Sequence, residues 1–552
     1  MTRLGRSAPR LGTLASAAML VSLHPPLELG AIVWVALVPW VVVVARAPTT
    51  RAAILQALWL ELLVGFGWGW WLPEAVADFF SVPVSAGFVA LVLNAAIHQL
   101  HWLPFAWCVR YASARTSSAR GTAIVLFLLP AAYCAFDWLL PGIFQHGLGA
   151  ALHDWPRLRQ AAAIGGVPML TGLVLLVNLA IAAVLRAGLE RDGSGPRSRV
   201  VGVAVAAASL PFAAALLYGE HRLDELAAAH DAADRTLRVA IVQGNVEGEI
   251  KRRWSRGDLD AARQALDVYL DETRRLLASR PRPELVVWPE TAYPGIYRRP
   301  ENEGQARLNA FFDRFIYTSG VPVVFGAYDR EERMDRRVLQ NALFAVQAEP
   351  GQARTALSPS QRYVKTILFP LGETLPWSSS AGETSRFWPT ARFSPGDGPA
   401  VLSIRRPQDG SIVRIGPLIC YEDLFTSHVA ALERLGADLL VNVSNDAWFG
   451  DRGEPRLHLI YARLRSVELG LPQVRVTNTG YSAVIHPSGE MPHVTAYGAR
   501  AADLVTLSMH RPSGRTLVAR WGDWFGGACA GIVVLAGAFD FVARRARRIS
   551  RH

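Results

Sequence analysis

The stretch Val413–Glu422, which reads VRIGPLICYE, decides the fold of the second half of this chain. It is a short, nearly continuous apolar run that ends on Cys420 and then turns acidic. Such a run, ending in polar groups, is typical of a strand that is buried on both faces. In folds built from buried strands, reactive side chains gather at the strand ends. The place of Cys420 therefore makes it a candidate for chemistry.

Four more runs of this kind lie along the same half of the chain. They read LRVAIVQGNV, ELVVWPE, VPVVFGAY and ADLLVNVSND, at residues 237–246, 284–290, 321–328 and 437–446. Helical patterns at 258–279 and 424–435 separate some of them. Strands that alternate with helices indicate an α/β domain in which helices cover the sheets. We expect this domain to occupy residues 220–521.

The first part of the chain has a different pattern. The 552 residues are 51% hydrophobic with a mean hydropathy of +0.20, which suits a protein with both a membrane part and a globular part. Most of the apolar stretches reach the ~20 residues that a helix needs to cross a bilayer. They lie at 11–23, 28–46, 54–73, 82–109, 121–140, 160–185, 199–218 and 524–543. We predict a bundle of about eight transmembrane helices: seven in residues 1–219, with the first uncleaved, and one in 522–552, followed by a basic cytoplasmic tail.

Charge predicts the orientation of this bundle. The formal net charge is +11, but the arginines cluster beside apolar segments, which favours membrane topology over a nucleic-acid groove. The arginine-rich connections are the N-terminus, 46–51, 110–120 and 186–199, and they alternate with loops that lack Lys and Arg. Basic loops stay on the cytoplasmic side, so residues 220–521 are expected on the opposite side.

Lysine and cysteine are used sparingly. Only two of the 57 basic residues are lysines, Lys251 and Lys365. Three of the four cysteines lie inside apolar segments, where a thiol packs as a small hydrophobe. Cys420 has no partner in its own domain, which argues against a structural disulfide.

Three predicted strand ends carry groups that complement one another chemically: Glu290, Lys365 and Cys420. A free thiol is only a few per cent thiolate at neutral pH, so a nucleophilic cysteine needs a base or a cation beside it. A carboxylate can take the proton, and an ammonium can lower the pKa of the thiol and stabilise a tetrahedral oxyanion. Each residue alone is more often structural, and only the combination indicates a site.

The motifs around these residues resemble those of the carbon-nitrogen hydrolase, or nitrilase, superfamily, whose fold is an αββα sandwich. They are VVWPET around Glu290, YVKTILFPLGETLP around Lys365, ICYE around Cys420, and the block NVSNDAWFGDRGEPRLHLIYARLRSVELGLPQVRVTNTGYSAVI at 442–485. Within the superfamily, that block, the membrane bundle and RWGDW at 520–524 resemble the apolipoprotein N-acyltransferase family. Departures include Val364 and Thr366 beside the lysine, TNTG at 477–480 and Leu457.

The resemblance implies roles for seven residues. Cys420 becomes the nucleophile, Glu290 the general base and Lys365 the oxyanion stabiliser, and the supporting or substrate-binding residues are Trp254, Glu373, Tyr421 and Glu422. The main-chain N–H of Tyr421 would be a second oxyanion donor. A segment at 375–393 with Trp377, Phe387 and Trp388 is either a mobile lid that touches lipid or an ordinary loop.

The implied reaction is a two-step acyl transfer, the last step of lipoprotein maturation. An acyl chain moves from a phospholipid such as phosphatidylethanolamine to Cys420 and then to the α-amino group of a diacylglyceryl-cysteine on an apolipoprotein. The implied location is the bacterial inner membrane, with the catalytic domain in the periplasm, and we expect a monomer. Two alternatives use the same sequence features: a membrane-tethered amidase or nitrilase, and a non-catalytic paralogue.

Cofactor motifs are missing from the sequence. There is no Walker loop, dinucleotide fingerprint or zinc-ligand spacing, so we predict cofactor-free chemistry and no metal site. His98 and His101 are spaced i, i+3 on a predicted transmembrane helix, and Asp137 lies near the outer end of another. We expect packing or interfacial roles for these side chains.

Overall fold

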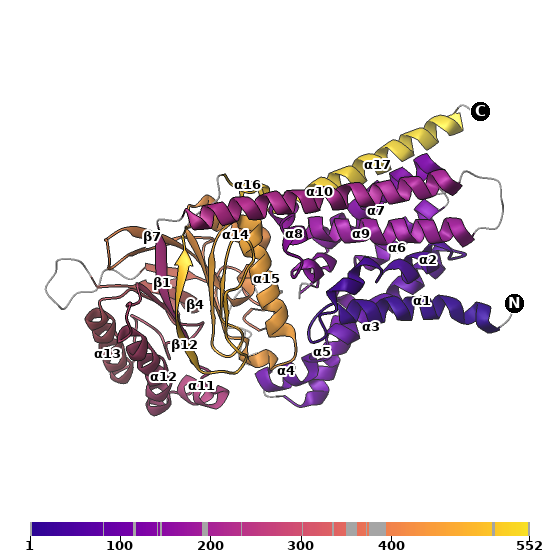
Figure 1. Cartoon of the computed structure of the whole chain (residues 1–552). Helices are drawn as coiled ribbons and strands as arrows, with labels where there is room; N and C mark the ends of the chain where they lie inside the picture. The colour runs from indigo at the N-terminus through magenta and orange to yellow at the C-terminus, as the bar shows by residue number, and fades with distance from the viewer. Residues whose placement is uncertain are drawn as a thin grey trace. The chain divides into compact units, whose positions relative to one another are not determined.

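The computed structural model describes residues 3–549 except for 81, 114–117, 141, 144–145, 190–196, 233–234, 301, 334–335, 349–360, 371, 375–392 and 510–513. The chain divides into two compact units (Figure 1). One unit comprises Met1–Leu223 and Asp523–His552, and the other comprises Asp224–Gly522.

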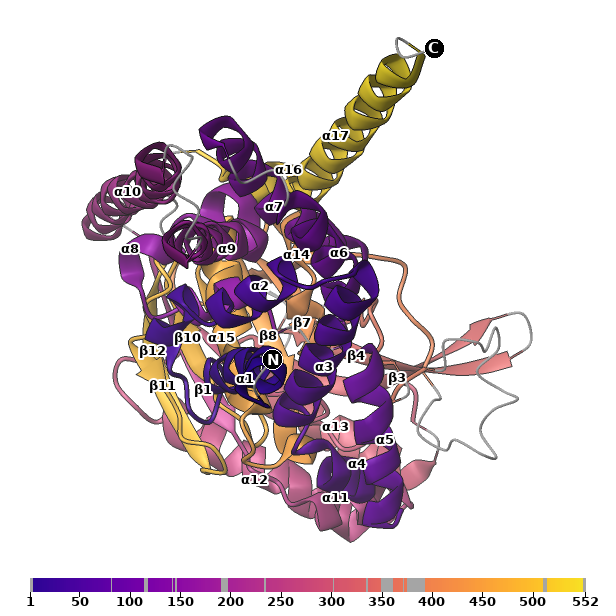
Figure 2. The ribbon, with the colours of Figure 1, turned by 90° about the vertical axis from the view of Figure 1, so that its right-hand side faces the viewer.

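The first unit is helical in its described residues. Its elements are α1 (Arg3–Ser22), η1 (Gly30–Trp34), α2 (Val38–Ala45), α3 (Thr50–Trp68), α4 (Leu72–Phe80), α5 (Val84–Ile97), α6 (Trp102–Ser113), α7 (Ala119–Leu139), η2 (Leu148–Leu152), α8 (Pro156–Arg159), α9 (Ala162–Leu189), most of α10 (Arg197–Asp231), and α17 (Trp524–Ile549). Figure 2 shows several of them nearly end-on, and α2 packs against both α1 and α9.

Six helical segments of the described chain are long and apolar enough to cross a membrane. They are Thr50–Trp68, Val84–Ser113, Ala119–Leu139, Ala162–Gly188, Ser198–Asp231 and Trp524–Arg547, and each overlaps a predicted span. The other two predicted spans are not among these six segments. The stretch 28–46 is divided between η1 and α2, which leaves a shorter apolar helical segment, Gly30–Ala45. The stretch 11–23 belongs to α1, whose first half contains the charged residues Arg3, Arg6 and Arg10.

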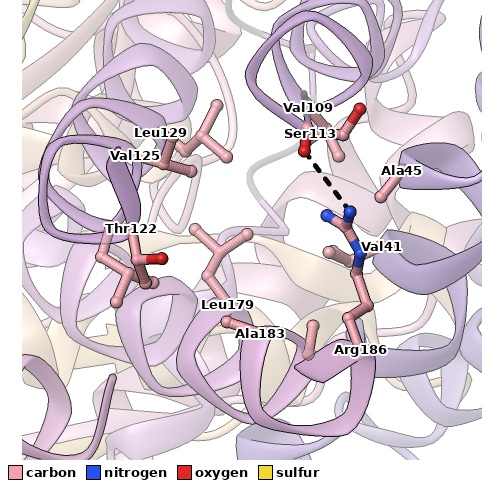
Figure 3. A pocket seen from close by; sticks show the side chains of 12 residues that line it. Val41, Ala45, Val109, Ser113, Thr122, Val125, Leu129, Leu179, Ala183 and Arg186 are labelled. Carbon is pink, nitrogen blue, oxygen red and sulfur yellow. Dashed lines mark hydrogen bonds between the residues drawn. The ribbon is translucent and has the colours of Figure 1, made fainter. Parts of the chain in front are cut away.

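A small cavity of about 30 Å³ lies among α2, α6, α7 and α9 (Figure 3). Apolar side chains such as Val125 and Leu129 line most of it, and Arg186 Nη2 donates to the main-chain oxygen of Ser113 at 3.4 Å. Its volume is on the order of one water molecule, so it is too small to hold an acyl chain.

The second unit contains two six-stranded sheets. The first has the order β12-β1-β2-β3-β4-β5 and the second β11-β10-β9-β8-β7-β6. The strands are β1 (Thr236–Gln243), β2 (Leu285–Val287), β3 (Val323–Arg333), β4 (Arg336–Val346), β5 (Gln361–Val364), β6 (Leu402–Arg405), β7 (Ile412–Ile419), β8 (Leu439–Ser444), β9 (Gln473–Thr477), β10 (Ala483–Ile485), β11 (His493–Val494) and β12 (Ala501–Ser508). The other elements are α11 (Gly248–Ser255), α12 (Leu259–Leu277), α13 (Glu303–Ser319), η3 (Cys420–Leu424), α14 (Thr426–Arg434), η4 (Asp446–Phe449), α15 (Glu454–Leu469) and α16 (Leu517–Trp521).

Alternation along the strands explains the layering. In β1, Val239 and Ile241 join the core between the two sheets, whereas Ala240 and Val242 join the core under α12 and α13. On the second sheet, residues of α14 and α15 cover the outer face. Figure 1 shows α12 and α13 on one side of the sheets and α14 and α15 on the other. The predicted αββα sandwich is confirmed.

The strands before Glu290 and Cys420 run parallel to neighbouring strands, whereas β5, before Lys365, is an edge strand that pairs antiparallel with β4. β1 pairs with β2 and β2 with β3 in parallel, and the second sheet repeats this with β7, β8 and β9. Parallel neighbours end at the same edge of a sheet, which brings residues from distant parts of the chain to one place.

Candidate active site

Glu290 is fixed by the backbone on either side of it. It lies three residues after the end of β2, and the two residues between are held in place, because Trp288 N–H donates to Val324 O at 2.8 Å and Gly326 N–H donates to Pro289 O at 3.1 Å. A Cβ atom at position 326 would lie 2.6 Å from Glu290 Cα, so this close approach requires glycine. The Glu290 side chain is 9% exposed.

Lys365 lies between two carboxylates at the end of β5. Its Nζ is 2.8 Å from Glu373 Oε2 and 3.7 Å from Glu290 Oε1, and its side chain is 1% exposed. Asn341 in β4 bridges the same two acids, because its Nδ2 donates to Glu290 Oε1 at 2.7 Å and to Glu373 Oε1 at 3.2 Å. Phe369 N–H donates to the other oxygen of Glu373 at 2.8 Å. Glu373 is thus held where it pairs with the lysine.

Cys420 stands at the turn between β7 and η3. Its backbone φ is +53°, in the left-handed region that side chains other than glycine rarely adopt. Such conformations persist only where the surroundings enforce them, and they cluster at functional sites. Asn442 Nδ2 donates to the Cys420 main-chain oxygen at 3.3 Å, and the side chain is partly buried.

The electrostatics differ from the sequence-based expectation for the thiol. Burial raises the pKa of Cys420, the charge of Glu290 raises it further, and the charge of Lys365 lowers it without offsetting the other two. Lys365 thus acts in the expected direction on the pKa of Cys420, but burial and the charge of Glu290 outweigh it. The thiol is protonated at rest and needs a base.

Glu290 has the properties of that base. Burial raises the pKa of its carboxyl, against the charge of Lys365, and the nearby charge of Glu373 raises it further. For Lys365 itself, burial disfavours the charged form, but the charges of Glu373 and Glu290 outweigh burial and raise its pKa above the usual value. The site therefore combines a permanent cation with an unusually basic carboxylate.

Glu422 connects the cysteine turn to the lysine segment. Its Oε1 accepts from Tyr363 Oη at 2.6 Å and from the main-chain N–H groups of Thr366 and Ile367 at 2.6 and 3.2 Å. Its Oε2 accepts from Ile419 N–H at 2.8 Å. Burial raises the pKa of Glu422 to about 7, against these hydrogen bonds. One fully buried side chain thus ties the end of β7 in one sheet to the end of β5 in the other.

A buried charge network lies behind the cysteine, and the sequence reasoning did not find it. Arg475 donates to Asp423 Oδ2 at 3.1 Å and to Asp446 Oδ2 at 3.0 Å. His458 Nε2 lies 2.8 Å from Asp423 Oδ1 and 3.2 Å from Cys420 O. Burial and Arg475 lower the pKa of His458, but the two aspartates raise it to about 9 overall. Through His458, Asp423 thus helps to anchor the backbone of the cysteine turn.

The last two predicted residues contribute aromatic rings. The Tyr421 ring lies 5.2 Å from that of Phe369. Trp254 is on α11, and its indole ring lies 5.9 Å from the ring of Tyr328. Burial and the charges of Glu290 and Glu373 raise the pKa of Tyr328, which places Tyr328 near the two acids. Of the predicted lid, Trp377, Phe387 and Trp388 lie outside the described residues.

His98 and His101, the two histidines selected from the sequence, are buried side chains. His101 Nε2 is 3.0 Å from Tyr133 Oη and its Nδ1 is 3.6 Å from Asp137 Oδ1. The ring of His98 lies 5.8 Å from that of Trp68. In the described part of the chain, the group of three residues with metal-ligand spacing contains neither histidine, and it consists of Glu28, His153 and the exposed Asp154.

Comparison with known proteins divides the chain in the same way. A carbon-nitrogen hydrolase family model matches residues 238–506, and a model of the apolipoprotein N-acyltransferase N-terminal domain matches residues 16–180. The apolipoprotein N-acyltransferase of Gloeobacter violaceus is 30% identical over 535 residues, which are 93% of this chain and 90% of the relative. That of Methylococcus capsulatus is 32% identical over 434 residues, which are 77% of this chain and 75% of the relative.

Solved structures also match part of the chain. An amidase from Nesterenkonia sp. has a TM-score of 0.34 and 19% identity, and the match covers 50% of this chain and 93% of the amidase. A member of branch 10 of the nitrilase superfamily from Saccharomyces cerevisiae has a TM-score of 0.35 and 17% identity, covering 50% of this chain and 91% of that protein.

Proposed function

This chain belongs to the apolipoprotein N-acyltransferase family, and from its site we propose that it moves the acyl chain through a thioester on Cys420. The proposed acyl donor is a phospholipid such as phosphatidylethanolamine, and the proposed acceptor is the α-amino group of the diacylglyceryl-cysteine of an apolipoprotein. The single observation that carries the roles is the convergence of a buried base, a buried cation and a thiol at strand ends of the sandwich.

In the first step, Glu290 takes the proton of the Cys420 thiol as the sulfur attacks the carbonyl carbon of the donor ester. A carbon–sulfur bond forms, and the oxyanion is stabilised by Lys365 and the main-chain N–H of Tyr421. The ester carbon–oxygen bond then breaks, and Glu290 returns the proton to the leaving glycerol oxygen. The lysophospholipid departs and the acyl chain remains as a thioester.

In the second step, the neutral acceptor amine attacks the thioester carbon. A carbon–nitrogen bond forms, and Glu290 takes one proton from the nitrogen. When the carbon–sulfur bond breaks, this proton returns to the sulfur and restores the thiol. The raised pKa of Glu290 suits both directions of transfer, because burial makes its carboxylate a stronger base than an exposed one.

The supporting residues hold the reacting side chains in position. Glu373 pairs with Lys365, and Glu422 joins the two strand ends that carry Lys365 and Cys420. We assign Trp254 and Tyr421 to contacts with the substrates, as the family resemblance implies. A displacement of about 1 Å at a reacting group can cost ~10²-fold in rate, so such fixed supports matter.

We also propose where the protein acts. It is a multi-pass membrane protein with six candidate spans in its described residues. The alternation of basic connections supports a location in the inner membrane with residues 220–521 in the periplasm. In this assignment residues 1–219 and 522–552 anchor the enzyme, which acts as a monomer.

Mass spectrometry of the intact protein tests the reaction. After incubation with phosphatidylethanolamine, we expect an acyl-sized adduct on Cys420 that disappears when a diacylated lipopeptide is added and reappears as a triacylated product. Cys420→Ser abolishes the adduct, and Glu290→Gln slows its formation. Release of the acyl chain to water instead of the lipopeptide would identify a hydrolase, and a lipid-bound protein without any adduct would contradict the proposal.

A further inference from the structure

The second lysine of the chain lies beside the same carboxylate as the first. Lys251 is on α11, and the charge of Glu290 is the one that favours its protonated form. Its neighbour one helical turn away is Trp254, whose ring contacts Tyr328. The chain has arginine at every other Lys/Arg position, and the charges of its only two lysines both lower the pKa of Glu290.

The ammonium group of Lys251 is buried without a hydrogen bond. Its Nζ has no accessible surface and no hydrogen-bond partner among the residues that the structure describes. The next two basic residues of the helix contrast with it, because Arg252 pairs with Glu249 and Arg253 with Asp258 on the exposed side. A buried, unpaired ammonium is costly, and its cost is recovered only when an anion binds it.

Glu290 is not the anion that pairs with Lys251. Its Oε1 already accepts from Asn341 at 2.7 Å and lies 3.7 Å from Lys365 Nζ, and it forms no ion pair with Lys251 among the described residues. Burial lowers the pKa of Lys251 to about 8, although Glu290 raises it, so the ammonium is still mostly charged at neutral pH. An ammonium without a hydrogen-bond partner therefore lies within electrostatic reach of Glu290.

We propose that Lys251 Nζ binds the phosphate of the phospholipid acyl donor, in an anion subsite next to Glu290. The proposal rests on the proposed function, because a phospholipid carries its phosphodiester on the same glycerol as the ester that Cys420 attacks. The acceptor's diacylglyceryl-cysteine has no phosphate. Lys251 thus distinguishes donor from acceptor and stays in contact with the lysophospholipid until it leaves.

The test compares two acyl donors with the same chain, phosphatidylethanolamine and an uncharged p-nitrophenyl ester, in the full-length protein. We expect Lys251→Met to lower kcat/KM for acylation of Cys420 by the phospholipid roughly ten- to a hundredfold, mainly through KM, and to affect the neutral ester far less. Lys251→Arg keeps the charge and retains most of the phospholipid reaction. Arg252→Gln, at the exposed neighbour, serves as the control and leaves the ratio of the two donors unchanged.

Competition identifies the phosphate directly. Glycerophosphate should inhibit acylation by the neutral ester in the wild type and lose that inhibition in Lys251→Met; inhibition by inorganic phosphate alone would indicate a site for free phosphate instead. Because Lys251→Met removes a buried unpaired charge, the melting temperature of this variant should not fall.

An equal loss of kcat/KM with both donors would overturn the proposal and would mean that Lys251 instead tunes the basicity of Glu290. No loss of kcat/KM with either donor would mean that Lys251 has no role in acylation. If the wild type is acylated by the ester but not by the phospholipid, the proposed donor itself is wrong.

Discussion

Removing the charge of Lys365 should destabilise the sandwich in a pH-dependent way. Its Nζ is the cation between Glu373, at 2.8 Å, and Glu290, at 3.7 Å, and all three side chains are largely buried. In Lys365→Met, no cation offsets the repulsion between the negative charges of Glu290 and Glu373. Breaking a buried ion pair by removing one partner costs ~3–5 kcal/mol, which corresponds to a fall in Tm on the order of 10 °C for a domain of this size.

The sign of the pH effect follows from linkage. The charge of Lys365 lowers the pKa of Glu290, so without the ammonium this pKa in the folded state rises further above its unfolded value, and the variant loses stability wherever the unfolded carboxyl is ionised. The loss relative to wild type is full at pH 8 and shrinks as the pH falls and Glu290 takes up a proton. Thermal unfolding of detergent-solubilised protein between pH 5 and pH 8 measures it.

A double variant isolates the cause. Lys365→Met combined with Glu373→Gln removes one of the two facing charges, but the single oxygen of the glutamine can accept from only one of Asn341 and Phe369, so it should recover only part of the lost stability. Glu373→Gln alone is the matched control. Equal melting of Lys365→Met and wild type at pH 8, or a double variant that is less stable than the single one, would refute the reasoning.

Two further predictions concern the base and the link between the sheets. Thioester formation should be lost as the pH falls through the raised pKa of Glu290 and recover as the pH rises, because only the carboxylate accepts the thiol proton; a pre-steady-state rate that stays constant from pH 4 to pH 8 would contradict this. Glu422→Gln should lower the free energy of unfolding by ~1–3 kcal/mol at pH 8 and slow acylation, because the amide of the new side chain turns a donor towards Ile419 N–H; denaturant unfolding and the adduct assay measure the two effects.

The sequence predicted the strand ends well, since each depends on a local pattern. A buried strand reads as an apolar run, and the residue that follows it is visible without knowing its neighbours. Glu290, Lys365 and Cys420 could therefore be selected before their distances were known. The membrane helices follow from equally local patterns, except at 28–46, where apolar residues alone did not reveal the break between η1 and α2.

What remained hidden depends on contacts between distant parts of the chain. Asn341 lies within an ordinary-looking strand, and its bond to Glu290 joins positions 51 residues apart. Arg475 is a charged residue inside a fully buried strand, a signal that could have been used, because a buried charge must be paired. The pKa of Cys420 depends on burial and on how far Lys365 is committed to its two acids, which sequence cannot give.

The division of the site between the sheets has a consequence for maturation of the enzyme itself. Glu290 and Lys365 belong to one sheet, whereas Cys420 belongs to the other, and Glu422 joins them. Under the roles proposed for Glu290 and Cys420, a sandwich whose two sheets have not docked has a thiol without its base. Acylation of Cys420 by a donor therefore reports that the two sheets have come together.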